Sequence, residues 1–227
     1  MSTDARVKVS NAIERLNAIL PLGQRLQRLD PTLAALYRNI LRSYVASGRS
    51  LTRSEIASQV NDVDAAIDVL KANDMVVFDE NGEPVGAYPF TMEPREHRVD
   101  VNGHRLRCMC ALDALAVSPM FGLQTEINSS CAVTGEAVKI EQRDRDIVND
   151  DENHDVYFGI NWNAAANNCC ATSLCTEMLF LKGGATADAW RDDAPDDREI
   201  FSLAEAVAFA AGFFTPLLHE RTARGSS

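Results

Sequence analysis

The sequence lacks the long apolar runs of membrane proteins and the basic bias of nucleic-acid-binding proteins. No apolar stretch approaches the roughly 20 residues of a spanning helix, and the opening segment MSTDARVKVS has no apolar core of a secretory signal. Lys and Arg number 22 against 33 Asp and Glu, giving a net charge of −11. Because phosphate-binding surfaces need clustered Lys and Arg, we expect no binding to nucleic acid. The missing apolar runs and signal segment lead us to expect a cytoplasmic protein that does not bind membranes.

The sequence also lacks the ligand spacings of structural zinc sites. Its six cysteines form no C-x-x-C pair, and its four histidines show no zinc-ligand spacing. The thiols are nevertheless concentrated, because no cysteine precedes position 108 and all six fall between 108 and 175. In a cytoplasmic protein they should be reduced. The clustering indicates metal or thiol chemistry, and inert packing thiols are the alternative.

Residues 1–92 predict a small helical module that ends in a hairpin. Apolar residues recur at helical spacing through its first half. Thr52 followed by Glu55 has the capping-box pattern of a helix start. A further amphipathic helix in DVDAAIDVLKAND leads to two extended pieces joined by an Asn81-Gly82 turn. This order of elements is that of a winged-helix module.

The charge of this module argues against DNA binding, the usual function of a winged helix. The helix that would enter the groove carries four acidic residues against the single Lys71: Asp62, Asp64, Asp68 and Asp74. DNA phosphates repel such a helix. We therefore expect the module to be a scaffold or a lid.

Residues 93–227 predict a second domain of short strands with helices at the ends, so the chain as a whole is α+β. Asn102-Gly103 is a strong hairpin signal between alternating strands, and a second hairpin should turn near Thr134-Gly135. VYFGINW and MLFL read as strands, and SLAEAVAFAAGFFTPLLHE as the last amphipathic helix. DRDIVNDDENHD is expected to be a charged loop.

An aspartate interrupts the apolar run RCMCALDALAV, residues 107–117. If a helix starts at Cys110, the helix dipole and free N–H groups should lower the pKa of this thiol, and Asp113 can reach the sulfur. A thiolate beside a carboxylate is unfavourable unless one of them holds a proton or a cation lies between them. The pair therefore predicts a site that binds a soft cation or transfers a proton. The alternative is a core cysteine beside an aspartate that caps backbone amides.

Three further cysteines lie close together in NNCCATSLCTEM. Cys169 and Cys170 are adjacent, and Cys175 follows five residues later. Thiolates are good ligands for soft metals, whereas a vicinal disulfide or simple loop thiols are the alternatives for the adjacent pair. Cys131 stands alone at the predicted second hairpin and is expected to be a packing residue.

Four segments resemble the organomercurial (alkylmercury) lyase family. They are CALDALA at 110–116, SSCAVTGEAV at 129–138, SLCTEMLFL at 173–181 with the DAW that ends at Trp190, and the helix SLAEAVAFAAGF. A winged-helix-like N-terminal module fits the same family. The resemblance implies cleavage of the carbon–mercury bond of compounds such as methylmercury, giving a hydrocarbon and Hg(II). It implies no cofactor, and small thiols or a mercuric reductase as acceptors of Hg(II).

The resemblance also implies two catalytic cysteines and one aspartate, which bind the mercury as well. The matching segments assign these roles to Cys110, Asp113 and Cys175. Counting back from Trp190 without a gap reaches Cys175, whereas Cys169 would require an insertion before the strand and is kept as the alternative.

The remaining matched positions include agreements and departures. Cys131 matches the structural cysteine of the family, but Cys108 is extra and Met109 stands where an aromatic residue is expected. These departures leave the organic group of the substrate open. Two rival functions also remain: a carrier that binds Hg or Cu without chemistry, and a metal-responsive winged-helix regulator.

Overall fold

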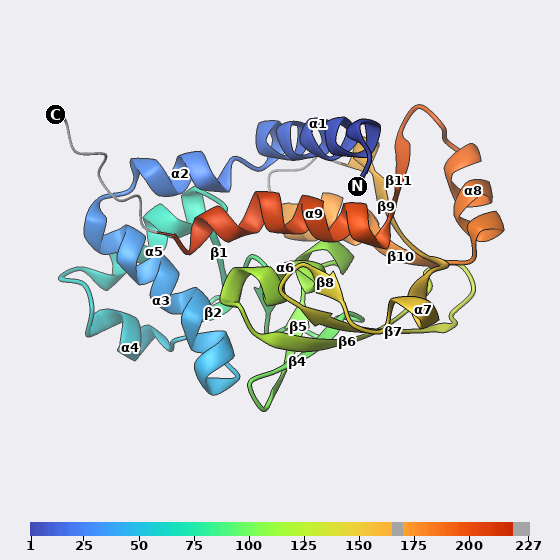
Figure 1. Ribbon diagram of the computed structural model, residues 1–227. Helices are drawn as coiled ribbons and strands as arrows, with labels where there is room; N and C mark the ends of the chain where they lie inside the picture. Colours follow the sequence, from blue (N-terminus) through green and yellow to red (C-terminus); the bar gives the residue numbers. More distant parts are fainter. Residues whose placement is uncertain (165–169, 220–227) are drawn as a thin grey trace, which may run out of the picture.

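The computed structural model describes residues 1–164 and 170–219 and has the α+β class that the sequence predicts. Helices form the N-terminal part, two antiparallel sheets follow, and a long C-terminal helix runs through the middle of the molecule (Figure 1). Within the described ranges, no helix is long and apolar enough to cross a membrane.

Five helices make up the N-terminal part. They are α1 (Thr3–Ile19), α2 (Leu22–Arg28), α3 (Pro31–Ser47), α4 (Arg53–Ala57) and α5 (Val63–Ala72). Side-chain caps fix their starts: the Asp30 carboxylate accepts the first free N–H groups of α3, and Thr52 with Glu55 forms the predicted capping box of α4. The ring of Tyr44 on α3 stacks on Phe90, with centroids 4.9 Å apart, and so joins the helices to the sheet.

The larger sheet has the order β1-β2-β3-β5-β4-β6-β7-β8. Its strands are β1 (Val76–Phe78), β2 (Pro84–Ala87), β3 (Phe90–Thr91), β4 (Arg98–Val101), β5 (His104–Cys108), β6 (Gln124–Ser130), β7 (Ala137–Arg143) and β8 (Asp146–Ile147). The short strand β3 pairs with β2 on one side and β5 on the other. The sheet therefore continues across the predicted domain boundary after residue 92.

Both hairpins of the second part turn where the sequence predicts. Asn102 and Gly103 have positive φ angles between β4 and β5, and Gly135 has one between β6 and β7. Val99 and Val101 face the core, as their alternation indicates. Strand β5 ends at Cys108, so Cys110 is free to begin a helix instead.

The smaller sheet has the order β10-β9-β11 and comprises β9 (Val156–Asn161), β10 (Met178–Lys182) and β11 (Arg198–Ser202), with α8 (Gly184–Asp192) packed on it. The expectation of a plain charged loop before β9 was wrong in part, because the segment forms β8 and α7 (Asp150–Asn153). The reason is local hydrogen bonding. The side chains of Asn149 and Asn153 donate to the Lys139 carbonyl, and Asn149 accepts the Glu141 N–H, which binds the segment to β7.

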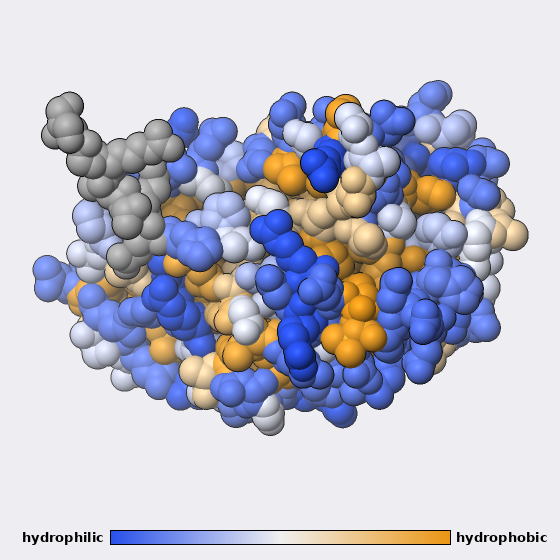
Figure 2. Space-filling view, in the orientation of Figure 1, coloured by the Kyte–Doolittle hydropathy of each residue, from blue (hydrophilic) through white to orange (hydrophobic). Residues whose placement is uncertain are grey.

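Two helices form the centre of the core. Helix α6 (Ala111–Phe121) is buried along nearly its whole length. Helix α9 (Leu203–Phe214) begins at a Ser202–Glu205 capping box and lies between α1 and α6 (Figure 1). Figure 2 shows a mostly hydrophilic face, with hydrophobic atoms gathered below α1, over the region that α9 occupies. The N-terminal and C-terminal helices thus cover the start of α6.

Candidate active site

Cys110 stands at the junction between β5 and α6. Its backbone is extended, with φ −152° and ψ 178°, and its sulfur accepts the N–H of Asp113 at 3.4 Å. The thiol thus occupies the capping position that Ser or Asp usually takes at a helix start. As a consequence, its sulfur is held at the N-terminal end of a buried helix.

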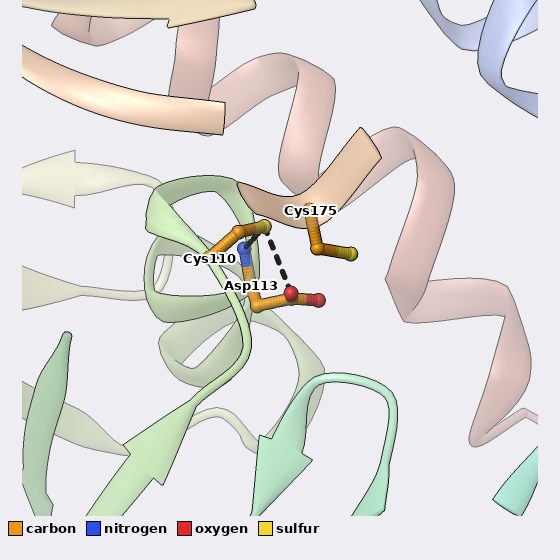
Figure 3. Close-up of side chains that lie close together, drawn as sticks. All are labelled: Cys110, Asp113 and Cys175. Carbon is orange, nitrogen blue, oxygen red and sulfur yellow. Dashed lines mark hydrogen bonds between the residues drawn. The ribbon is translucent and has the colours of Figure 1, made fainter. Parts of the chain in front are cut away.

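Asp113 lies in the first turn of α6, and its carboxyl group accepts a hydrogen bond from the Cys110 thiol. The Cys110 thiol donates to Asp113 Oδ2 at 2.8 Å, and the Asp113 residue is only 1% exposed (Figure 3). Its other oxygen, Oδ1, is buried without a hydrogen-bond partner among the described residues. A buried carboxyl oxygen without a partner is costly, so this atom is available to a ligand or a proton.

Cys175 reaches the same place from a distant part of the chain. It belongs to a short 3₁₀ helix, η3 (Leu174–Glu177), directly before β10. In Figure 3 its side chain extends toward the carboxyl group of Asp113. The ligand atoms of Cys110, Asp113 and Cys175 all lie within 4.8 Å of one another, and all three residues are buried. The structure therefore brings together the three residues to which the resemblance assigns catalysis.

Burial controls the protonation of this cluster. It raises the pKa of Asp113 from 3.8 to about 7, despite the opposing hydrogen bond from Cys110. Burial also raises the pKa of Cys110 to about 12, with a smaller contribution from the negative charge of Asp113. The expectation that the helix start lowers this thiol pKa was wrong, because loss of solvent outweighs the backbone N–H. Hydrogen bonds with Cys110 and Cys170, followed by burial, raise the pKa of Cys175 well above its usual range.

The cluster borders a small cavity among buried residues. Its volume of about 10 Å³ is close to the space that one water molecule requires. Apolar side chains from α1 and α9 and the sulfur atoms of four residues dominate its lining: Leu16, Leu20, Phe213, Phe214, Cys110, Cys170, Cys175 and Met178. A partly ionised carboxyl and several thiols thus share a space from which solvent is excluded.

The other cysteines have different surroundings. Cys108 is buried in β5 opposite Phe90. Cys131 is buried beside β10, and its sulfur accepts the Lys182 N–H at 3.3 Å, consistent with packing. Cys169 lies outside the described residues. Cys170 is a free thiol rather than half of a disulfide.

Sequence reasoning missed two sulfur atoms at the site. Cys170 contacts Cys175 at 3.7 Å, and Met178 Sδ lies 3.5 Å from Cys110 Sγ. Cys170 is only five residues before Cys175, but the two thiols lie in separate 3₁₀ helices, η2 (Cys170–Thr172) and η3, so the spacing alone did not show that they meet. Met178 offered no signal, since a methionine that opens an apolar strand is usually a packing residue.

These features define a class of protein: an α+β protein with a closed two-thiol, one-carboxyl site suited to soft metals. The sequence profile of the alkylmercury lyase family (MerB) matches residues 90–215, which is more than half of the chain. The chain therefore belongs to the alkylmercury lyase family.

Relatives from several bacteria agree with this assignment. The alkylmercury lyase of Bacillus cereus is 28% identical over 192 residues, covering 84% of this chain and 86% of that protein. The alkylmercury lyase of Staphylococcus epidermidis is 27% identical and covers 71% of this chain and 73% of its own length. That of Pseudomonas putida is 24% identical, with coverages of 71% and 75%.

A solved structure shows the same fold. The crystal structure of the mercury-bound form of MerB2 superposes with a TM-score of 0.72 at 20% identity, covering 88% of this chain and 98% of that one. The arrangement of helices and sheets thus matches this solved structure over nearly the whole length of the MerB2 chain.

Proposed function

We propose that this protein cleaves the carbon–mercury bond of organomercurials by protonolysis and releases a hydrocarbon and Hg(II). One observation carries the proposal: the Cys110 sulfur lies 2.8 Å from an Asp113 oxygen, and the Cys175 sulfur is within 4.8 Å of both. The alkylmercury lyases that resemble the chain, such as that of Bacillus cereus at 28% identity, support it.

Binding of the substrate requires thiolates, whereas the buried thiols are protonated in the free protein. An organomercury ion is a soft cation, and sulfur ligands bind it far better than oxygen ligands do. The first Cys–Hg bond, at Cys110 or Cys175, displaces the anion or thiolate that accompanies the organomercury ion, and this leaving group takes the first thiol proton. When the second thiol adds, Asp113 accepts its proton. With a pKa of about 7, the carboxyl group is partly ionised near neutral pH, so it can serve as this base.

The same proton then completes the reaction. Two sulfurs on mercury increase electron density on the bonded carbon and weaken the carbon–mercury bond. Asp113, now protonated, delivers its proton to the departing carbon and becomes a carboxylate again. One carboxyl group thus acts first as base and then as acid, while Hg(II) stays on the cysteine pair.

The cavity serves this proton transfer. Apolar side chains exclude bulk water, which keeps the carboxyl pKa high and prevents competing proton donors. Leu16 of α1 and Leu20, the residue directly after α1, belong to that cover. We therefore infer that the N-terminal module, winged-helix-like in its element order, acts as a lid over the site rather than as a DNA reader.

Headspace gas chromatography tests the proposal directly. Purified protein with methylmercury and excess thiol should release methane in proportion to protein and time. Asp113→Asn should still bind mercury but lose most of this release, by about 100-fold or more. Methane release at the wild-type rate from Asp113→Asn would show that the carboxyl group is not the proton donor.

The sulfur-rich cavity also fits a second candidate, a carrier that binds Hg or Cu without cleaving bonds. Cys170 and Met178 place two additional soft atoms beside the catalytic pair. A carrier predicts stoichiometric metal uptake with no hydrocarbon in the headspace, so the same assay separates the two functions. In either case we propose small cytoplasmic thiols or a mercuric reductase as the acceptors.

A further inference from the structure

A third cysteine shares the cavity with the proposed catalytic pair, and the proposed reaction does not use it. The Cys170 sulfur lies 3.7 Å from the Cys175 sulfur, and both residues line the cavity. Cys170 is a free thiol in the 3₁₀ helix η2 (Cys170–Thr172). Zinc–sulfur bonds are about 2.3 Å long, so one thiolate-bound metal spans sulfurs up to roughly 4.6 Å apart. The larger mercury ion spans at least as much.

The three thiols form a row with Cys175 in the middle. Cys110 lies at the inner end, where its thiol donates to Asp113. Cys175 interacts with Cys110 on one side and Cys170 on the other. Apart from the Met178 thioether, which lies 3.5 Å from the Cys110 sulfur, a metal held by Cys110 and Cys175 has Cys170 as its next sulfur ligand, on the Cys175 side.

At the outer end of this row, partly exposed polar side chains hold the backbone of Cys170, a residue that is itself 5% exposed. The Cys170 N–H donates to Asp74 Oδ2 at 3.2 Å, and the Asp74 carboxylate lies 4.0 Å from Arg25. These two side chains are 15% and 24% exposed, respectively. The Ala171 carbonyl beside Cys170 accepts a hydrogen bond from Arg95 at 3.3 Å. Polar, partly exposed groups thus anchor the backbone at Cys170, whereas apolar groups surround Cys110.

We propose that Cys175 and Cys170 form a second binding position for Hg(II), through which the product leaves the site. In this step the Cys170 sulfur bonds to mercury, and the bond between mercury and Cys110 then breaks. The proton released by Cys170 passes to the Cys110 thiolate. Mercury remains Hg(II) throughout, so no oxidant or reductant is needed. Two outside thiols then repeat the exchange, one at Cys170 and one at Cys175. Each gives its proton to the cysteine it replaces, and Hg(II) leaves bound to the two outside sulfurs.

A relay of this kind solves a kinetic problem of the small cavity. Two buried thiolates hold a soft cation tightly, and the cavity, at about 10 Å³, has little room for an attacking thiol. Exchange of one sulfur for another avoids free Hg(II), because the metal keeps two sulfur ligands at each stage. Transfer to the outer position brings the metal within reach of solvent thiols and returns Cys110 to its protonated form.

The relay rests on the proposed function because that reaction supplies the Hg(II). The transfer itself starts from bound Hg(II), so it can be tested without carbon–mercury cleavage. Wild-type protein, Cys170→Ser and Cys170→Ala are loaded with one equivalent of HgCl₂ and mixed in a stopped-flow instrument with a chromogenic dithiol chelator. Cys131→Ser is the matched control, since that buried thiol lies outside the cavity lining. Both Cys170 variants should take up one equivalent and release it at least 10-fold more slowly than wild type, while the control matches wild type.

The possible outcomes separate the two proposals. Release from both Cys170 variants at the wild-type rate would overturn the relay and leave the lyase proposal intact. Failure of the variants to take up one equivalent would also overturn it, because Cys170 would then be needed to hold the metal at the inner position. If the Cys170 variants release Hg(II) slowly and the wild-type protein yields no methane, the relay is supported and the lyase proposal is rejected.

Discussion

Burial of Asp113 favours its role in proton transfer but lowers the stability of the folded protein. The residue is shut off from solvent in the first turn of α6, with one oxygen hydrogen-bonded to a thiol and the other without a partner. Its pKa rises to about 7 because the charged form is poorly solvated there. The same shift that suits a proton carrier destabilises the folded protein when the carboxyl group ionises.

The Asp113→Asn variant should therefore be more stable than wild type at alkaline pH. The folded state binds the Asp113 proton more tightly than the unfolded state, so this contribution to stability is complete below pH 3.8 and is lost as pH rises through about 7. Asparagine is neutral at every pH, which relieves a cost on the order of 4 kcal/mol at pH 8. Thermal unfolding should show a larger gain in Tm at pH 8 than at pH 5.

The exposed Asp146 on β8 provides the control. Asp146→Asn should change Tm little, and equally at both pH values. A gain in the Tm of Asp113→Asn that is the same at pH 5 and pH 8 would mean that ionisation of Asp113 does not destabilise the fold.

The second thiol of the site can be tested by a pair of serine substitutions. Cys175→Ser removes a soft ligand and should reduce methane release from methylmercury by at least about 100-fold. Cys131→Ser, at a buried thiol beside β10 whose sulfur accepts the Lys182 N–H, should keep the wild-type rate. Equal loss in both variants would indicate a general structural effect, and full activity of Cys175→Ser would exclude it as a ligand.

The sequence indicates the local part of this site more readily than the distant part. Cys110 and Asp113 are three residues apart, so a helix start alone brings them together. Cys175 was selected from the family resemblance by its distance to Trp190, and spacing along the chain could not show that it meets Cys110. Met178 reaches Cys110 through the packing of β10 on α6, and Cys170 reaches Cys175 through the packing of η2 on η3. No local pattern encodes either contact.

Among the elements, the contact between α8 and the smaller sheet depends on a missing side chain. A Cβ atom at Gly159, in the middle of β9, would lie 2.9 Å from both the Trp190 ring and the Leu181 side chain. Trp190 also lies under the Arg198 guanidinium, 4.8 Å from it, which limits how far the ring can move. The glycine at position 159 therefore allows α8 to pack closely on β9.

Gly159→Ala should thus destabilise the protein by about 1–3 kcal/mol through overpacking. Urea unfolding followed by circular dichroism measures this change in the free energy of unfolding. Gly23→Ala in α2 is the matched control, because its Cβ would meet no atom within 4 Å and alanine favours helix. The control should be neutral or stabilised by up to about 1 kcal/mol, and equal effects in the two variants would contradict close packing at Gly159.

Elements with strong local chemistry are the ones that the sequence predicts. The Asn102-Gly103 turn, the Thr52–Glu55 capping box and the apolar C-terminal helix all appear as expected. Helix α8 and strand β11 carry weaker patterns, since charged residues are interleaved with few apolar ones, and they were not predicted. They are ordered by their contacts with β9 and with each other.

At the scale of the whole molecule, the site is closed by segments from both ends of the chain. Leu16 and Leu20 near the end of α1 and Phe213 and Phe214 at the end of α9 border the same cavity. Helices α1 and α9 pack on each other, and Lys8 pairs with Glu205 at 3.2 Å across this contact. A space of about 10 Å³ is too small for an organomercurial, so the proposed reaction requires this cover to move.

Loosening the cover should expose the buried thiols. Leu16→Ala removes part of the cavity wall and should speed the alkylation of Cys110 and Cys175 by iodoacetamide at least 10-fold, as measured by mass spectrometry of peptides. Leu36→Ala is the matched control, since Leu36 is equally buried but lies in α3, outside the cavity lining. Each variant should lose roughly 2–5 kcal/mol of stability. Equal acceleration in the two would indicate global unfolding rather than opening of the cover.

The two-residue strand β3 has a consequence for any attempt to shorten this protein. A fragment that begins at residue 93 would lack β1, β2 and β3. Strand β5, which leads directly into Cys110, would then have one edge of unpaired backbone groups. Such bare strand edges recruit other chains. The lyase-like part on its own should therefore self-associate, even though the sequence profile of its family begins only at residue 90.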